Sequence, residues 1–349
     1  RVHFVSPRAD FEDAAIASFR VQASAIPAYG DYVRYLGIDP DRIGSWLEIP
    51  PVPTSAFKSH DLSAAPLGRE AAIFETSGTT ISTPGRVRLG STDLYEASLL
   101  DGFEAHLLPD EARLHAVVFG PTRAEAPRSS LWFMADRVVE RLSSGGTWIV
   151  RRGEPDWGAA DRALERAATE GTPVLLFGTT LLFMAYVERL AASGRRVALP
   201  PGSRAMDTGG AKGLRAEFTR AEVEAGFSAQ LGIPATHLVN EYGMAEMGSQ
   251  FYDDALVAAH EGRAPKPGKG ISPWVRTRVL HPETMQEQPD GEPGLLIHYD
   301  LANFEIPLAI QTEDVGFREG DRLHLAGRLL DAEPRGCSLT FERFVGARR

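Results

Sequence analysis

Residues 171–194, GTPVLLFGTTLLFMAYVERLAASG, give the clearest indication of the fold class. Its first 17 residues, Gly171–Val187, carry no charge, which approaches the length of a membrane span. A proline and a Gly-Thr-Thr sequence interrupt this run. A strand at Val174–Phe177 followed by a helix at Leu181–Ala192 therefore explains it better. We expect a strand–helix unit here and no membrane span.

Strand and helix patterns alternate on both sides of this stretch. Predicted strands lie at Leu114–Phe119, Thr147–Val150, Val197–Leu199 and His237–Asn240, and predicted helices at Leu131–Leu142, Asp156–Thr169 and Leu214–Leu231. Asp156 suits the N-cap of its helix, and Gly171 lies close to where that helix should end. Repeated strand–helix units predict a parallel sheet that is covered by helices.

The chain changes character before residue 71 and after residue 260. Short helical stretches broken by proline occupy the first part, whereas a Gly- and Pro-rich segment leads into the last part. The β-like runs that follow are Val275–Leu280, Leu295–Tyr299, Leu308–Gln311 and Leu323–Ala326. The regions that we expect are an N-terminal helical segment at 1–70, an α/β core at 71–260, a small β-rich subdomain at 261–326 and a short C-terminal tail at 327–349.

The composition argues against several classes of protein. The 349 residues are 43% hydrophobic and 24% charged, which is typical of a globular chain. The net charge is −10, so we expect no nucleic-acid partner. The single cysteine forms no internal disulfide and fits a reducing compartment, and the first residues lack the apolar core of a signal peptide. We therefore expect a soluble, cytoplasmic protein.

A loop rich in hydroxyl groups and glycine, Thr76–Gly85 (TSGTTISTPG), follows an apolar run. Such a loop presents O–H and backbone N–H donors to phosphate oxygens, because glycine lets the backbone come close. Taken alone, the segment is better explained as a solvent-exposed turn. The chain lacks the P-loop, Rossmann, nucleophile-elbow and HExxH motifs, which argues against those enzyme classes.

Two later segments favour a nucleotide site. His237–Glu246 (HLVNEYGMAE) places a predicted strand before a turn. Within it, Tyr242 offers a flat face for stacking on a base, and Glu246 is a hard oxygen ligand suited to Mg²⁺ on phosphates. Gln311–Gly316 (QTEDVG) places Asp314 at the end of a predicted strand, where it could accept hydrogen bonds from ribose hydroxyls.

The ordered set TSGTT…TPG, YGMAE, TEDVG and Gly327-Arg328 resembles the adenylate-forming superfamily of acyl- and aryl-activating ligases. Within that superfamily, the chain is similar to the acyl-protein synthetase (LuxE-type) family. The blocks that carry this likeness are IPPVPTSAFK at 49–58, DTGGAKG at 207–213, NEYGMAEMGSQFYD at 240–253, YDLAN at 299–303 and RGCSL at 335–339. Each block is weak alone, but the blocks span almost the whole chain in order.

The resemblance implies an α/β fold: an adenylate-forming N-terminal-type domain with parallel sheets flanked by helices, a small β-rich subdomain and a truncated C-terminal domain. It also implies an ATP-dependent, AMP-forming ligase that acts on a carboxylic acid, with a fatty acid favoured. The acid attacks the α-phosphate of ATP, giving an acyl-adenylate and pyrophosphate, and a thiol then takes the acyl group. Such transfer depends mostly on positioning and charge neutralisation.

The resemblance assigns roles to individual residues, with region 71–260 as the nucleotide-binding core. The nucleotide-binding residues by family position are Ser77, Gly78, Thr79 and Thr80 for the phosphates, Gly209, Gly210, Tyr242 and Gly243 for the adenine pocket, Asp314 for the ribose, and Arg328 near the ribose or α-phosphate. The same likeness gives Glu246 to Mg²⁺, so the implied cofactors are ATP and Mg²⁺.

The lysines depart from the superfamily pattern. The usual phosphate loop continues Gly-x-Pro-Lys, whereas Arg86 stands near that place, and no lysine follows Lys269. Superfamily members with a complete C-terminal domain normally use a lysine there for adenylation. The positive charge would then come from Arg328, Arg335 or Lys212, of which Lys212 is either catalytic or a solvated loop residue.

Cys337 is the only cysteine, and it lies between Gly336 and Ser338 near the end of the sequence. The guanidinium of Arg335, two residues earlier, would favour the thiolate. In the LuxE-type family a cysteine near the C-terminus receives the acyl group, so the resemblance implies that role for Cys337. A structural turn at this place is the alternative.

Three functions follow from these observations. The favoured one is activation of a carboxylic acid and transfer of the acyl group to Cys337 and then to a partner protein. An acyl reductase as that partner is implied by the family likeness alone. The alternatives are a ligase that acylates a small-molecule amine or hydroxyl, and a nucleotide-binding scaffold subunit without catalysis.

Overall fold

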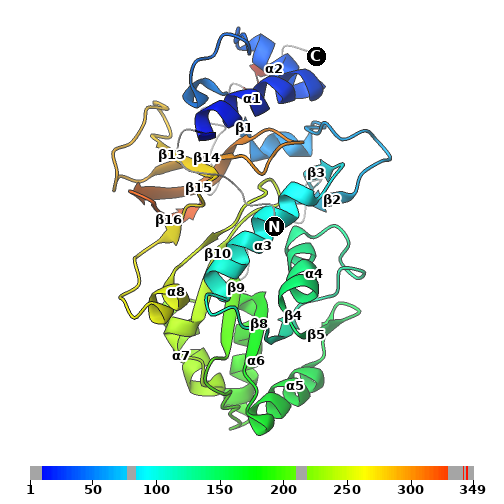
Figure 1. Cartoon of the computed structure of the whole chain (residues 1–349), viewed down its shortest axis with the longest axis vertical. Coiled ribbons are helices and arrows are strands. Elements are labelled where there is room, and N and C mark those ends of the chain that lie inside the picture. Colours follow the sequence, from blue (N-terminus) through cyan, green and yellow to red (C-terminus); the bar gives the residue numbers. More distant parts are fainter. Residues whose placement is uncertain (1–9, 77–83, 210–217, 329–340, 342, 345–349) are drawn as a thin grey trace. The chain divides into compact units, whose positions relative to one another are not determined.

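The computed structural model describes residues 10–76, 84–209, 218–328, 341, 343 and 344 (Figure 1). The chain divides into two compact units. Unit 1 comprises residues 1–98, 244–249 and 268–349, and unit 2 comprises residues 99–243 and 250–267. Among the helices described, none has the length and apolar character that a membrane crossing requires.

Unit 2 is built on a six-stranded sheet that is parallel except at one edge. Its strands, in spatial order, are β11 (Phe251–Tyr252), β10 (Leu238–Tyr242), β9 (Arg204–Thr208), β8 (Val174–Thr179), β4 (His115–Phe119) and β5 (Gly145–Trp148). Only β11 pairs antiparallel with its neighbour. The parallel sheet that the strand–helix alternation predicts is therefore confirmed.

Helices pack against both faces of this sheet (Figure 1). They are α3 (Asp93–Leu107, which begins in unit 1), α4 (Ser130–Leu142), α5 (Trp157–Glu170), α6 (Thr180–Ala192), α7 (Arg220–Gly226) and α8 (Ala255–His260). Short elements of the same unit are β6 (Val150–Arg151), β7 (Glu154–Pro155), a π-helical turn at Phe227–Leu231 and a 3₁₀ turn at Ala235–His237.

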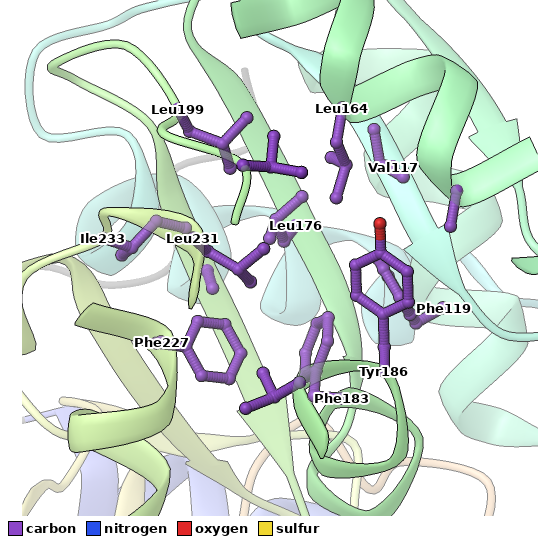
Figure 2. Close-up of a cluster of buried hydrophobic side chains, with 14 of the residues drawn as sticks. Val117, Phe119, Leu164, Leu176, Phe183, Tyr186, Leu199, Phe227, Leu231 and Ile233 are labelled. Atoms are coloured by element: carbon purple, nitrogen blue, oxygen red, sulfur yellow. The ribbon is translucent and has the colours of Figure 1, made fainter. Parts of the chain in front are cut away.

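The main core of unit 2 lies between the sheet and α5, α6 and α7. Figure 2 shows Leu176 of β8 among Leu164, Phe183 and Phe227, and all four side chains are almost completely buried. On the opposite face, the ring of Phe177 stacks at 6.0 Å on Phe103 of α3. Consecutive residues of β8 thus face opposite helical layers, as the pleat of a buried parallel strand requires.

The predicted ends of α5 are confirmed. Asp156 caps the helix by accepting a hydrogen bond from the Ala159 N–H at 2.9 Å. Gly171 ends it in the left-handed conformation, at φ 65°, which glycine adopts without a steric penalty.

The predicted strand at Val197–Leu199 is wrong. The N–H groups of Val197 and Leu199 donate to the carbonyls of Gln230 and Leu231, at 2.8 and 3.0 Å. Those carbonyls belong to the last residues of the π-helical turn after α7, where the helix itself provides no N–H donor for them. The segment therefore satisfies the end of a helix instead of joining the sheet. Helix α7 itself begins at Arg220, where Thr219 caps it, later than the predicted start.

Unit 1 is built on an antiparallel sheet to which the N-terminal part of the chain adds a strand. Its strands, in spatial order, are β12 (Lys269–Gly270), β16 (Arg322–Arg328), β15 (Ala309–Glu319), β14 (Gly294–Asp300) and β13 (Val275–Leu280). Strand β1 (Val52–Pro53) pairs parallel with β15 through Val52 and Ile310. The other elements are α1 (Asp10–Ala25), α2 (Pro27–Tyr35), the hairpin β2 (Ala72–Glu75) and β3 (Arg86–Leu89), and 3₁₀ turns at Trp46–Glu48 and Thr54–Lys58.

A buried carboxylate lies at the end of β14. Oδ1 of Asp300 accepts hydrogen bonds from the Ser249 hydroxyl at 2.8 Å and from the Ala302 N–H at 2.9 Å. Oδ2 is buried and has no hydrogen-bond partner within the described parts of the chain. Burial raises the pKa of Asp300 to about 6, although the hydrogen bonds oppose that effect.

Asp300 should make the protein less stable as the pH rises. Its pKa of about 6 in the folded chain exceeds the ordinary value of 3.8, so the native state holds this proton more tightly than the unfolded state does. The stabilisation is complete below the ordinary value and is lost, by roughly 3 kcal/mol, as the pH rises through the folded value.

The measurement is urea unfolding of wild type and Asp300→Asn between about pH 4 and pH 8. The substitution removes the titration, so the variant should gain stability relative to wild type across this interval. Because the other titrating groups are common to both proteins, they cancel in the difference. Parallel stability curves would contradict the raised pKa.

Candidate functional site

The carboxyl ends of three parallel strands meet at one edge of the sheet in unit 2. The register aligns Thr179 of β8 with Thr208 of β9, and Thr208 with Glu241 of β10. Gly209 therefore leaves β9 beside Tyr242, the last residue of β10. Open α/β sheets bind their ligands at this edge.

A buried carboxylate, Asp207, ties these strand ends together. Its Oδ1 accepts a hydrogen bond from the guanidinium of Arg220 at 2.7 Å. Its Oδ2 lies 2.8 Å from the Thr180 hydroxyl and 3.0 Å from the side-chain amide nitrogen of Asn240. The donors come from the start of α6, from α7 and from β10, so one side chain fixes the spacing of three neighbouring elements.

Glycines shape the same edge. Gly209 has φ 76°, in the left-handed region, and its carbonyl oxygen lies 2.7 Å from the Thr180 hydroxyl. A Cβ on Gly243 would overlap the carboxylate of Glu241, which also accepts a hydrogen bond from Thr208. At Gly209 and Gly243, this edge is therefore lined by backbone and not by side chains.

The structure thus brings together three of the residues predicted for the adenine pocket, Gly209, Tyr242 and Gly243. The ring of Tyr242 lies 5.6 Å from that of Phe251 and is tilted by 42° against it. The role of these residues in binding a base stays a prediction.

In unit 1, the pairing of β15 with β16 places Asp314 opposite Arg328. Nε of Arg328 lies 3.6 Å from Oδ1 of Asp314, and its Nη2 lies 3.0 Å from Oε2 of Glu313. The two residues predicted to bind the ribose and the α-phosphate region are therefore cross-strand neighbours. Asp314 lies inside β15 and not at its end, because the strand continues to Glu319 after an irregularity at Val315.

Glu246 also belongs to unit 1, in the segment 244–249 between β10 and β11. Its side chain is largely buried, and its backbone carbonyl accepts a hydrogen bond from Asn303 at 2.9 Å. Across the described residues, no three His, Cys, Asp or Glu side chains are grouped as a metal site. A single carboxylate still fits Mg²⁺, because this ion keeps waters and takes most other oxygens from substrate phosphates.

Several predicted site residues lie outside the described part of the chain. They are Ser77, Gly78, Thr79, Thr80, Gly210, Lys212 and Cys337. The ends of the predicted phosphate loop are described. The Thr76 N–H donates to the Gly85 carbonyl and the Gly85 N–H to the Thr76 hydroxyl, both at 2.9 Å. These two bonds extend the β2–β3 hairpin to the base of the loop.

Sequence reasoning missed the polar group around Asp207. Asp207 and Asn240 lie in the DTGGAKG and NEYGMAE blocks, but they attracted no role. No strand was predicted at β9 (Arg204–Thr208). Had that strand been recognised, the charged side chain of Asp207 would have been the signal, since such a residue is rarely buried without a partner. Arg220 could not be found this way, because its contact with Asp207 depends on where α7 begins.

Comparison with known proteins identifies the family of this chain. A model of the acyl-protein synthetase LuxE family matches residues 11–345. Two curated proteins are similar over shorter stretches, and both are named long-chain-fatty-acid–luciferin-component ligase. The protein of Aliivibrio fischeri is 28% identical over 113 residues, which cover 30% of this chain and 27% of that protein. The protein of Vibrio harveyi is 30% identical over 86 residues, 23% of each chain. The matches thus span about a quarter of each relative.

Solved structures give the fold. ATP-bound MatB from Rhodopseudomonas palustris is 19% identical with a TM-score of 0.53, and the match covers 84% of this chain and 55% of MatB. A 2-hydroxyisobutyryl-CoA ligase, in complex with 2-HIB-AMP and CoA, is 15% identical with a TM-score of 0.67, and the match covers 93% of this chain and 71% of the ligase. At such low identity these likenesses establish the mixed α/β fold of adenylate-forming enzymes and nothing further.

Removing the carboxylate of Asp207 should destabilise unit 2 strongly. Asp207→Ala leaves the Arg220 guanidinium without its nearest charge partner and removes a carboxylate acceptor from Thr180 and Asn240, at a cost of about 3 kcal/mol. The free energy of unfolding in urea measures the loss. Asp41→Ala is the matched control, because that carboxylate is 90% exposed and lies 3.9 Å from Arg20. It should change stability by less than about 1 kcal/mol. Equal losses in both variants would contradict the structural role of Asp207.

Proposed function

Because the chain belongs to the acyl-protein synthetase LuxE family, we propose that it activates a carboxylic acid with ATP and transfers the acyl group to a thiol. The observation that carries this proposal is the extent of the family match. Residues 11–345 include every segment to which the sequence assigned a part of the chemistry, from the loop at 76–85 to Cys337.

A long-chain fatty acid is the substrate that we propose. The names of the two curated relatives support this choice, since both are called ligases of long-chain fatty acids. The matched stretches cover only about a quarter of those proteins, so the support is for the class of acid and not for a chain length.

In the first half-reaction, a carboxylate oxygen of the acid attacks the α-phosphorus of ATP. The bond from that phosphorus to the bridging oxygen breaks, and pyrophosphate leaves with the electron pair. The protein's task is to hold the nucleotide and neutralise charge. We propose that Asp314 accepts hydrogen bonds from the ribose hydroxyls and that Arg328, its cross-strand neighbour, supplies positive charge.

Glu246 is the residue that we propose as a protein ligand of Mg²⁺. The ion, when bound, would neutralise charge on the phosphates of ATP. The chemistry of the side chain supports this role, because a carboxylate oxygen is a preferred ligand of Mg²⁺. The glycines at the edge of the parallel sheet, with Tyr242, are proposed to bind the adenine.

In the second half-reaction, the thiolate sulfur of Cys337 attacks the carbonyl carbon of the acyl-adenylate. The bond from that carbon to the phosphate oxygen breaks, AMP leaves, and a thioester forms on the protein. Transfer to a partner protein, such as an acyl reductase, would follow by attack of a second nucleophile on the thioester. Cys337 suits the step because it is the only thiol of the chain.

Asp314→Ala should raise the KM for ATP and change the KM for the fatty acid little. Loss of a hydrogen-bonded, charged acceptor for the ribose corresponds to about 1.5–3 kcal/mol. Fatty-acid-dependent exchange of labelled pyrophosphate into ATP measures both constants. Asp290→Ala is the matched control, because Asp290 forms a comparable ion pair with Arg318 at 3.0 Å in the same unit. An unaltered KM for ATP would remove Asp314 from the nucleotide site.

Cys337→Ser should separate the two half-reactions. Adenylation uses no thiol, so pyrophosphate exchange should persist, whereas covalent label from a radioactive fatty acid should disappear. A serine hydroxyl is a much poorer nucleophile near neutral pH than a thiolate. Thermal unfolding serves as the control for a structural role of Cys337. A variant that still collects thioester-type label would refute acylation of Cys337, and release of an acylated small molecule without label would favour a small-molecule ligase.

A further inference from the structure

The segment 244–249 of unit 1 carries Glu246 and forms no helix or strand. Within it, only a turn between the Met247 N–H and the Met244 carbonyl, at 3.2 Å, is a backbone hydrogen bond of the described set. Glu246 is nevertheless only 6% exposed. The conformation of this segment must therefore be fixed largely by groups outside it.

Asn303 is the side chain that makes this connection. Its Oδ1 accepts a hydrogen bond from the Gly248 N–H at 2.8 Å, and its Nδ2 donates to the Glu246 carbonyl at 2.9 Å. The two partners determine the orientation of the amide, since an N–H needs the oxygen and a carbonyl needs the nitrogen. One amide thus holds the backbone on both sides of Met247.

The surroundings of Asn303 leave this contact little freedom. Asn303 is 3% exposed, and a Cβ on Gly248 would lie 2.8 Å from Cβ of Ala302. The Ser249 hydroxyl, one residue further on, donates to Oδ1 of Asp300 at 2.8 Å. The backbone at Gly248 therefore approaches that at Ala302 closely, and polar contacts at the consecutive residues 248 and 249 hold the two segments together.

Helix α1 contacts the part of the chain that carries Asn303. Nε2 of Gln22 donates to the carbonyls of Asn303 at 2.6 Å and Ile306 at 2.7 Å, while its Oε1 accepts from the Leu308 N–H at 3.0 Å. Gln22 is 1% exposed, so these bonds are shielded from water. Gln22 thus fixes residues 303–308, and Asn303 in turn fixes the segment with Glu246.

We propose that Asn303 is a positioning residue for Glu246, and that Gln22 reinforces it. The inference rests on the proposed function, in which Glu246 is a ligand of Mg²⁺. A carboxylate that serves a metal must be held near its productive place, and its supporting contacts decide how well this is done. Asn303 does so through the backbone of the segment and touches no reacting atom.

The test is the Mg²⁺ dependence of fatty-acid-dependent pyrophosphate exchange in the full chain. Asn303→Ala removes both contacts with the segment. It should raise the concentration of Mg²⁺ needed for half-maximal exchange about tenfold, in the range expected when support of a metal ligand is lost. Saturating Mg²⁺ should restore most of the rate. Gln22→Leu should shift the same constant in the same direction by a smaller factor.

Asn303→Asp tests the two contacts separately. It keeps an acceptor for the Gly248 N–H but loses the donor to the Glu246 carbonyl, and it should also raise the Mg²⁺ requirement. If Asn303→Ala folds poorly, this variant and Gln22→Leu carry the test. Hydrogen exchange read on peptides that contain residues 244–249 should show faster exchange at Gly248 in Asn303→Ala and not in Asn303→Asp.

Thr277→Val is the matched control. Thr277 is 2% exposed in the same unit, and its hydroxyl lies 2.9 Å from Nδ1 of His298. Its loss should lower thermal stability without changing the Mg²⁺ requirement. If Asn303→Ala resembles this control, and only stability falls, the positioning role is refuted.

The outcome for Glu246→Gln distinguishes the two proposals. If wild type shows no acid-dependent exchange, or if Glu246→Gln leaves the Mg²⁺ requirement unchanged, the proposed function or the role of Glu246 fails. If Glu246→Gln raises the requirement and the variants of Asn303 and Gln22 do not, the positioning inference alone is wrong.

Discussion

The hydrogen-bonded carboxylate of Asp207 is the contact on which the carboxyl edge of the sheet in unit 2 depends. A parallel sheet gives all its strands the same direction, but it does not fix how the loops leave the ends of the strands. Asp207 supplies that constraint, because Arg220, Thr180 and Asn240 approach it from three separate elements. Gly209, which has the left-handed conformation, lies two residues after Asp207 in the sequence.

The buried carboxylate in unit 1, that of Asp300, has a different environment. Asp300 receives hydrogen bonds from Ser249 and Ala302, and no cation from the described ranges of the chain contributes to its environment. Burial therefore favours the neutral acid, whereas Asp207 has the guanidinium of Arg220 to balance its charge. The two carboxylates show how one side-chain type can either fix an ionic contact or hold a proton, depending on what packs beside it.

The sequence predicted what depends on neighbours along the chain. The strand at Val275–Leu280 has the predicted bounds, and the cap of α5 at Asp156 and its end at Gly171 follow from local chemistry. The order of the motifs was sufficient for the family, and the cross-strand pair of Asp314 and Arg328 lies where two of those motifs meet.

Contacts between distant segments could not be predicted in this way. The parallel pairing of β1 with β15 joins Val52 to Ile310, and nothing in a proline-rich stretch indicates which strand it will join. The error at Val197–Leu199 has the same origin, because the carbonyls that take its N–H groups belong to the end of a helix some thirty residues later. Asn303 was visible only as part of the YDLAN block, since the role of an amide depends on the backbone that it faces.

The contact of Gln22 with residues 303–308 has a consequence for biosynthesis. Its two ends are separated by more than 280 positions along the chain. Helix α1 leaves the ribosome long before residues 303–308, so its buried amide has no partner until those residues have been translated. Unit 2, whose segments lie between residues 99 and 267, can assemble first, while the N-terminal residues wait with an apolar face exposed. Nascent chains stalled before residue 300 should therefore be the form that chaperones recognise.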